Sequence, residues 1–349
     1  MMVERSWTTR RYRSGDEHDL LSLFNRVFGK SRSLDHWRWQ FERNPYAPPT
    51  MILARRRSDD LLAGSHVVMP IAMNAGGVRF LAAHTLDLVV HEDFRRQGIF
   101  ETTARECFEW CLERGMQAVI AFPNTQSYPG FVRTLGWSRI LDPFRWDLRV
   151  GLAGVGVGEP RASVLSRLAD PLWRSVIRSR LVHRGPWQSE WRGDAPADHD
   201  DLWRRCAPEL KLSLFKDREY LRWRYDANPD HRFRYVTARR DGRLDGVAVV
   251  LSEAGRTTIC DLITARRAGD AVARTLIVEV SRQASAQGDD RITFLGRDDG
   301  YFDRCLKGFR RRLAPESVLT GRGLGDHDVD DLVRDGANWT LCFGDADYV

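Results

Sequence analysis

The feature that most constrains the fold is a motif that occurs twice. The pattern Trp-x-aromatic-x-x-Asn-Pro lies at residues 39–45 and again at 223–229, an offset of 184 residues. Further matches follow in the same order in both halves: Ala54-Arg55-Arg56 with Ala238-Arg239-Arg240, Gly64-x-x-Val67-Val68 with Gly246-x-x-Val249-Val250, Asp87-Leu88 with Asp261-Leu262, and Leu135-Gly136-Trp137 with Lys307-Gly308-Phe309. So many ordered matches indicate two copies of one folding unit. We interpret the Trp/Asn-Pro motif as core packing followed by a helix stop, because Pro disfavours helix at the preceding residue.

Each copy predicts the same order of elements: a helix (16–28; 198–210), a strand pair (51–56 and 62–70; 234–239 and 246–251), a third strand (83–90; 257–264), a second helix (99–114; 270–287) and a further strand (118–122; 291–295). Strands that start as hairpins and finish as β-α-β units predict an α/β fold with a mixed, mostly antiparallel sheet flanked by helices. We expect domains at 1–150 and 191–349. Residues 151–190 are expected to form a linker, rich in Gly at 151–160 and helical at 162–181.

Composition fits this organisation. The 349 residues suit two domains, and 42% hydrophobic with 29% charged residues can bury real cores. We find no apolar run of membrane-spanning length and no signal-peptide core, so a soluble, cytoplasmic protein without a membrane partner is expected. The six Cys are scattered without a Cys-x-x-Cys pair, which predicts neither disulfides nor a metal site.

The net charge does not identify a partner. There are 54 basic and 48 acidic residues, giving +6, but the two signs alternate along the chain. A nucleic-acid partner is therefore not predicted, and a positive cleft for a phosphorylated ligand explains the charge as well. The oligomeric state is not indicated.

The segment 84–100 carries the strongest functional signal. An apolar strand at 86–90 runs into the loop Arg95-Arg96-Gln97-Gly98, and a helix starts at once with Ile99-Phe100. A helix start exposes unpaired N–H groups and the positive end of the helix dipole, which suits an anion. Gly98 allows close approach of the backbone, and the two Arg add charge, so a pyrophosphate is the expected guest.

After this loop come the strand 118–122, then Pro123-Asn124, and then a segment that closes with Leu135-Gly136-Trp137. This order resembles the GNAT superfamily of acyl-CoA N-acyltransferases, whose [Arg/Gln]-x-x-Gly-x-[Gly/Ala] loop holds the pyrophosphate of coenzyme A. The resemblance is strongest over 83–140 and implies acetyl-CoA as the cofactor. It also implies a tandem form, since tandem members of the superfamily pair an active copy with a degenerate one.

Carried over residue by residue, the resemblance assigns the following cofactor contacts: Arg95, Arg96, Gln97, Gly98 and Ile99 to the pyrophosphate, Leu88, Val89 and Val90 to the pantetheine arm, and Asn124 to the region near the thioester. Phe100 departs from the family, which commonly has Gly or Ala there, and its bulk is expected to reshape the loop.

The second copy lacks this loop. Arg266 and Gly269 keep the first spacing, but Asp270 would place a carboxylate at the start of the next helix. A carboxylate there caps the helix and repels a pyrophosphate, so we expect this copy to have kept the fold and lost the cofactor.

For the chemistry, the resemblance implies direct attack of an amine on the thioester, assisted by a base and an acid. His84 occupies the position of a Glu base in several members, and its ordinary pKa suits proton removal at neutral pH. A hydrogen-bonded histidine beside the core remains the alternative. The usual Tyr acid is replaced by Val132, and Tyr128 is either a substitute acid or a packing residue.

Two other sets of side chains are interpreted as structural. Strict alternation places Asp87 on the strand face opposite His84, and its recurrence as Asp261 favours a structural role. Cys107 and Cys111 lie at helical spacing and are expected in the core rather than in a covalent site.

We therefore expect an N-acetyltransferase that moves acetyl from acetyl-CoA to a primary amine of a small molecule, with an amino sugar or sugar nucleotide as the candidate acceptor. The alternatives are a longer acyl-CoA or an acyl carrier protein as donor, and a non-catalytic protein that senses coenzyme A. Aminoacyl-tRNA-dependent transferases of the same fold are disfavoured, because their donor has no coenzyme A pyrophosphate for the 95–99 loop to bind.

Overall fold

The computed structural model describes residues 5–152, 169–173, 175, 185–268, 270–297 and 301–346. They form two compact units. Unit 1 contains residues 1–141, 227–230 and 316–338, and unit 2 contains the remainder. The expected linker and its helix at 162–181 lie largely outside the described residues.

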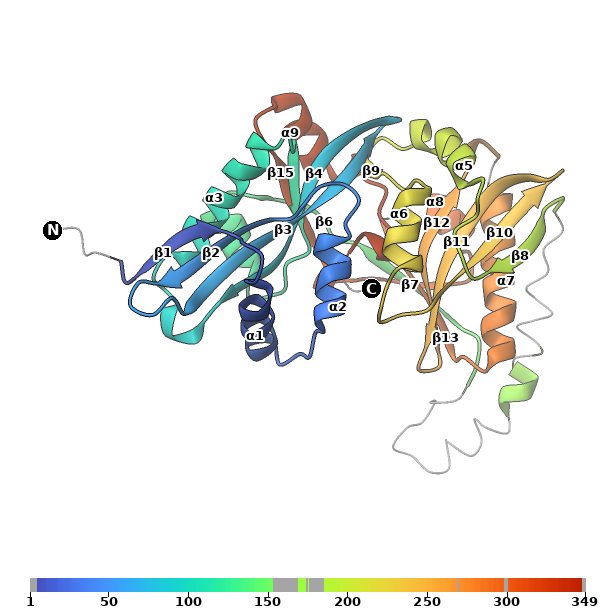
Figure 1. Ribbon diagram of the computed structural model, residues 1–349. Coiled ribbons are helices and arrows are strands. Elements are labelled where there is room, and N and C mark those ends of the chain that lie inside the picture. The colour runs from blue at the N-terminus through green and yellow to red at the C-terminus, as the bar shows by residue number, and fades with distance from the viewer. Residues whose placement is uncertain are drawn as a thin grey trace. The chain divides into compact units, whose positions relative to one another are not determined.

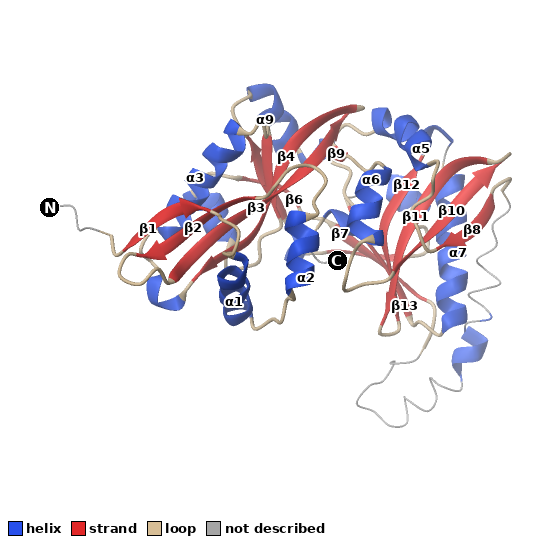
Figure 2. Ribbon diagram, in the orientation of Figure 1, coloured by secondary structure: helices blue, strands red, loops and turns tan. Residues whose placement is uncertain are grey.

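The sheet of unit 1 is mixed and mostly antiparallel (Figures 1 and 2). Its strands, in spatial order, are β1 (Trp7–Arg11), β2 (Thr50–Arg56), β3 (Leu62–Ala75), β4 (Val78–Val90), β5 (Ala118–Ala121), β15 (Leu319–Gly323) and β6 (Ser138–Leu141). Of the pairs between these neighbouring strands, β4 with β5 is parallel and the others are antiparallel.

The sheet of unit 2 repeats this pattern. Its spatial order is β8 (Gln188–Arg192), β10 (Phe233–Arg240), β11 (Arg243–Glu253), β12 (Arg256–Thr264), β13 (Arg291–Gly296), β7 (Phe144–Arg149) and β14 (Arg310–Leu313). Here only β12 and β13 are parallel. The predicted fold class, two mixed sheets flanked by helices, is confirmed.

Helices cover both sheets. Unit 1 has α1 (Glu17–Phe28), α2 (Leu34–Trp37), α3 (Ile99–Glu113) and α9 (His327–Arg334), with short turns η1 (Arg38–Glu42), η2 (Glu92–Phe94), η3 (Gly130–Thr134) and η8 (Gly336–Asn338). Unit 2 has α5 (His199–Cys206), α6 (Arg218–Leu221), α7 (Ala271–Gln287) and α8 (Tyr301–Cys305), with the short strand β9 (Ser213–Leu214) and turns η4 (Ala207–Glu209), η5 (Arg222–Asp226), η6 (Arg266–Ala268) and η9 (Phe343–Asp345); η7 (Pro315–Ser317) leads into β15. Among the described helices, none is long and apolar enough to cross a membrane.

One strand of each sheet comes from the other half of the chain. β15 lies between β5 and β6, pairing antiparallel with both, although it follows them by almost two hundred residues. In the same way β7 lies between β13 and β14. The units therefore do not follow the expected boundaries at 150 and 191, since 142–150 belongs to unit 2 and 316–338 to unit 1.

Two prolines explain why the sixth strand of each copy does not turn back as a hairpin. Asp142-Pro143 follows β6, and Ala314-Pro315 follows β14. Pro at this position cannot supply the positive φ of a tight hairpin turn, and it holds the preceding residue in an extended conformation. The chain therefore runs straight out of each sheet. Where the two exits meet, Ala314 N–H donates a hydrogen bond of 2.9 Å to Pro143 O.

The repeated motif builds the same local structure in both units. Trp39 and Phe41 are buried on η1, and Trp223 and Tyr225 are buried on η5. After each turn an Asn side chain accepts a hydrogen bond from the backbone two residues on, at 2.9 Å for Asn44 and 3.0 Å in the second copy. The interpretation as core packing with a helix stop agrees with these contacts.

The position of β15 predicts an effect of Gly321→Ala. A Cβ at Gly321 would lie 2.6 Å from the carbonyl oxygen of Val119 in β5, so backbone must shift. We expect Gly321→Ala to lower the free energy of unfolding by about 1–3 kcal/mol, measured by urea unfolding. Gly193→Ala is the matched control because that position is open, and its expected change is within about 0.5 kcal/mol. Equal stability of the two variants would contradict the placement of β15.

A buried histidine in β3 predicts acid sensitivity. His66 is fully buried with no hydrogen bond from either ring nitrogen to a described residue, and burial lowers its pKa to about 3. The unfolded chain takes up a proton near pH 6.5 while the folded ring stays neutral, so stability falls as the pH drops below 6.5.

The expected loss from this group is about 2 kcal/mol between pH 7 and pH 5. Urea unfolding at both pH values checks it, and His66→Leu should remove that part of the pH dependence. His18→Leu, at an exposed position, should leave it in place. A His66→Leu protein with the full pH dependence would disprove this assignment.

Candidate active site

The loop before α3 has the backbone shape expected of an anion site. Arg96 and Gly98 both have positive φ, 63° and 82°, and Gly98 is the N-cap of the helix. The first hydrogen bond within α3 runs from Thr102 N–H to Gly98 O at 3.0 Å. The N–H groups of the first turn therefore have no partner within the helix and are available to a ligand.

The charges around this helix start also favour an anion. Arg95, Arg96 and Gln97 are all exposed. Glu101, in the first turn, would oppose an anion, but its carboxylate is paired with Arg105 at 2.9 Å. The two arginines of the loop therefore dominate the local field.

Phe100 points away from this loop. A Cβ on Gly130 would lie 2.7 Å from the Phe100 ring, and the ring centroid is 5.9 Å from that of Phe131. The bulky residue is thus accommodated by a glycine on the segment after β5, and it links α3 to η3. Its effect on the loop, expected from the sequence, stays a prediction.

The strands next to this loop separate. Parallel pairing of β4 with β5 is confined to Ala83–Val119 and His84–Ile120. Beyond it, β4 carries one residue more than β3 in a bulge around Asp87, which has a φ of 44°. Leu88, Val89 and Val90 continue beyond the bulge, so the edge of β4 toward β5 offers backbone N–H and C=O groups to a ligand.

The bulge corrects the expected direction of Asp87. Ala83 packs in the cluster under α3 with Cys107 and Cys111, both fully buried, so His84 points to the opposite face, where α1 and α2 lie (Figure 1). Alternation would turn Asp87 toward α3. Instead the bulge turns it toward the α1–α2 connection, where it forms an ion pair with Arg32.

His84 lies where β4 and β5 part. It occupies the last described rung of their pairing, is 3% exposed, and meets Phe122 edge-on at 5.6 Å between ring centroids. This position at the head of the strand gap fits a base. Its burial also fits the packing alternative, and both interpretations stay open.

The remaining predicted residues lie on the segment after β5. Asn124 is exposed, and its carboxamide oxygen accepts hydrogen bonds from the N–H groups of Gln126 and Ser127 at 3.0 and 2.9 Å. The oxygen therefore caps the turn, which leaves the amide nitrogen for a ligand. Tyr128 is half-buried, with the Arg139 guanidinium 5.8 Å from its ring centroid.

The corresponding gap in unit 2 is filled by the chain itself. β12 also bulges, at Cys260, and pairs with β13 only up to Ile259–Phe294. Residues 342–346 lie in the region beyond: Cys342 bridges to Gly296, and a Cβ on Gly344 would lie 1.9 Å from the Tyr225 hydroxyl. This segment therefore occupies the space where β12 and β13 part.

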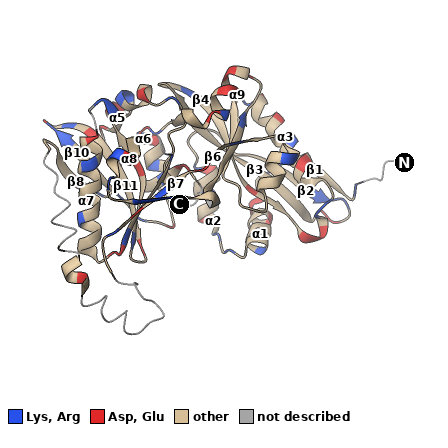
Figure 3. Cartoon of the chain, turned by 180° about the vertical axis from the view of Figure 1, so that it is seen from behind, with Lys and Arg blue, Asp and Glu red and all other residues tan. Residues whose placement is uncertain are grey.

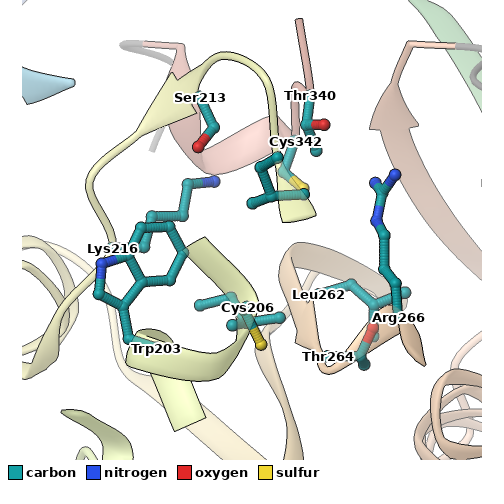
Figure 4. Close-up of a pocket in the computed structure, with 11 residues that line it drawn as sticks. Trp203, Cys206, Ser213, Lys216, Leu262, Thr264, Arg266, Thr340 and Cys342 are labelled. Carbon is teal, nitrogen blue, oxygen red and sulfur yellow. The ribbon is translucent and has the colours of Figure 1, made fainter. Parts of the chain in front are cut away.

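A buried charge cluster holds the filling segment. Lys216 forms ion pairs with Asp261 and with Asp345, the latter at 2.6 Å, and Tyr225 donates to Asp261 at 2.5 Å. Burial opposes the charge of Lys216, but the two carboxylates raise its pKa well above the ordinary value. Burial raises the pKa of Asp345 to about 6, although Lys216 lowers it. The cavity beside Lys216 is only about 30 Å³, room for a water molecule (Figure 4).

The ion pairs at the two bulges were not anticipated from the sequence. Arg32 and Lys216 stand at the same offset as the Trp/Asn-Pro motif, and their partners Asp87 and Asp261 were already matched. The sequence did contain a signal for these ion pairs, because both copies have a basic residue at this position of the repeat.

The start of α7 carries the expected carboxylate, but the side chain does not cap the helix as predicted, because it makes no cap hydrogen bond to the described helix start. Asp270 is its N-cap residue, and its carboxylate pairs with Arg304 at 2.9 Å and Arg274 at 3.3 Å. Within the described part of the chain, no group of three or more His, Cys, Asp or Glu side chains is placed to hold a metal ion.

Known proteins support these geometric findings. A family model described as an acetyltransferase (GNAT) domain matches residues 8–140. A search among curated proteins found no match. A probable N-acyltransferase of unknown function from Enterococcus faecalis is similar in structure, with a TM-score of 0.67 and 10% identity over 97% of this chain and 85% of the other.

Two further solved structures share the fold. A GCN5-related N-acetyltransferase from Anabaena variabilis has a TM-score of 0.67 at 10% identity, covering 91% of this chain and 73% of its own. The N-myristoyltransferase of Saccharomyces cerevisiae, solved with bound myristoyl-CoA, has a TM-score of 0.58 at 12% identity, covering 98% and 86%. At these identities the likeness concerns the fold, and it extends over both units. The family match identifies residues 8–140 as a GNAT acetyltransferase domain, and the structural neighbours share the fold.

Proposed function

We propose that unit 1 transfers an acetyl group from acetyl-CoA to a primary amine of a small molecule, with an amino sugar or sugar nucleotide as the candidate acceptor. The observation that carries this proposal is the coincidence of two features. The strand gap that opens after His84 leads directly to the glycine-capped start of α3.

The residues present fit coenzyme A. Arg95, Arg96 and the first-turn N–H groups of α3, beginning at Ile99, are the groups that would hold a diphosphate. Leu88 to Val90 would supply a strand edge for the amide groups of the pantetheine arm, and the Asn124 amide nitrogen would donate a hydrogen bond to the cofactor. When bound, acyl-CoA supplies a thioester that an amine can attack.

The protein's own part in the reaction is proton transfer and orientation. His84 would take a proton from the acceptor ammonium or amine, directly or through water, because an alkyl amine is mostly protonated at neutral pH. N–H groups of the bulged β4 edge would polarise the thioester carbonyl. The C–N bond forms as the C–S bond breaks, and Tyr128 or solvent returns a proton to the departing thiolate.

The loop predicts the affinity for acetyl-CoA. Arg95→Ala and Arg96→Ala should each weaken binding by ~10- to 100-fold, since each removes a charge-assisted contact to phosphate. Isothermal titration calorimetry measures this effect. Arg267→Ala, an exposed arginine at the corresponding place in unit 2, is the matched control and should bind normally. Unchanged affinity in both loop variants would refute the assigned cofactor site.

The placement of His84 predicts a defect in turnover rather than in cofactor binding. In an assay of acetyl-CoA consumption with a panel of amines, His84→Ala should lower kcat by ~10²- to 10⁴-fold while acetyl-CoA affinity stays within a few-fold. Tyr128→Phe tests the acid in the same assay. Normal turnover by a folded His84→Ala protein would show that His84 is not the base and would favour its interpretation as a packing residue.

The donor alternatives are separate arms of that assay. Faster turnover with longer acyl-CoA thioesters, or with an acylated acyl carrier protein, would show that this compound and not acetyl-CoA is the preferred donor. Acetyl-CoA binding without acylation of any amine would favour a protein that senses coenzyme A.

A further inference from the structure

Unit 2 contains a large cavity far from its filled strand gap. Its volume is about 800 Å³, within the range of ~300–1,000 Å³ typical of small-molecule sites. The walls come from β7, α7, the loop 307–309 and β14, and from Arg291 at the start of β13. The strand gap lies at the other end of β13, beyond Phe294.

The lining of this cavity is strongly basic. It contains seven cationic side chains: Arg149, Arg274, Arg291, Lys307, Arg310, Arg311 and Arg312. Asp147 is the only carboxylate among the described lining residues. Elsewhere in both units basic and acidic segments are interspersed (Figure 3), so this concentration of one sign is local.

Three of these cations are already paired with acidic groups: Arg312 with Asp147, Arg274 with Asp270 and Arg311 with Asp303. Asp147 is already engaged by Arg312 at 3.3 Å and Arg145 at 3.4 Å. Among the residues that the structure describes, no carboxylate forms an ion pair with Arg149, Arg291, Lys307 or Arg310.

Three arginines stand in a row across the sheet. Arg149 of β7 lies directly opposite Arg291 of β13, and Arg291 lies directly opposite Arg256 of β12. Like charges in directly opposed positions destabilise a sheet. On its other side Arg256 lies opposite Glu253 of β11, so the like-charge contact without an opposed carboxylate is that of Arg149 with Arg291, and an anionic ligand would relieve this repulsion.

We propose that this cavity binds a nucleoside polyphosphate. Arginine guanidinium groups match phosphate oxygens in bidentate geometry, and three arginines without an ion pair to a described carboxylate (Arg149, Arg291, Arg310) line the cavity together with Lys307. Phe309 and Trp173 supply aromatic surface on which a base can stack. A volume of about 800 Å³ suits a small molecule better than a nucleic-acid strand. This proposal does not depend on acyl transfer in unit 1.

The test is binding of ATP, measured by calorimetry and by thermal unfolding of the full chain. Binding of pyrophosphate and of adenosine, measured separately, gives the contributions of the phosphate charge and of the base to the affinity for ATP. To exclude the loop of unit 1, the measurements are made on the Arg95→Ala, Arg96→Ala protein. We expect ATP to raise Tm and bind more tightly than either fragment, with affinity that falls as salt rises.

The variants Arg291→Ala and Arg310→Ala should each weaken ATP binding ~10-fold or more. Arg204→Ala, an exposed arginine of unit 2 outside the cavity, is the matched control and should bind ATP normally. Without ligand, Arg291→Ala should unfold at the same or a higher temperature, because it removes like-charge repulsion; a merely structural arginine would lower it.

Three results would overturn the proposal. They are no binding of ATP, binding that persists in both cavity variants, and an equal loss in Arg204→Ala. Tight binding of a single-stranded oligonucleotide, with ATP much weaker, would instead assign the cavity to a nucleic-acid surface.

Discussion

The ion pair between Arg32 and Asp87 holds the bulge on which the site of unit 1 depends. A non-glycine residue at a φ of 44° is strained, and here a nearly buried charge pair compensates that strain. Because the bulge adds a residue to β4, its edge no longer follows β5, and the gap opens beyond His84. The Arg32–Asp87 ion pair thus fixes the bulge, and the bulge leaves backbone N–H and C=O groups unpaired at the edge of β4 that faces β5.

Unit 2 also has a bulge held by a buried ion pair, but there the strand gap is filled by the chain. Lys216 and Asp261 replace the Arg–Asp pair, and β12 bulges and leaves β13 in the same way. The opened edge would leave polar groups unsatisfied in the interior, and the chain covers it with its own residues 342–346, anchored by Asp345. Lysine and two carboxylates then form a closed network with Tyr225 in place of an open site. At the start of α7 the N-cap residue is Asp270, whose carboxylate is paired with Arg274 and Arg304, where α3 has Gly98.

Much of this was predictable because it is local. Hydrophobic periodicity placed the strands and helices of both copies within a few residues, and the Gly98 turn followed from a glycine and two arginines ahead of an apolar helix. Other features depend on contacts between distant segments. The signals for the exchange of β7 and β15 are Pro143 and Pro315. They indicate where a hairpin turn cannot form, but they do not indicate with which strand the next segment pairs. The direction of Asp87 could not be read from alternation, because a one-residue bulge inverts it.

The exchange also bears on what the second copy retains. A sheet that has lost its ligand could drift in sequence until it no longer folds, but β15 of unit 1 follows unit 2 in the chain, and β7 of unit 2 precedes it. Each sheet is complete only when the whole chain is present, so selection on unit 1 also maintains unit 2. That argument accounts for a preserved core, but it does not account for cations lined up at Arg149, Arg291 and Arg256, since a scaffold kept only for its fold would be free to replace them. The proposed polyphosphate site would give these cations a role that completing the fold does not require.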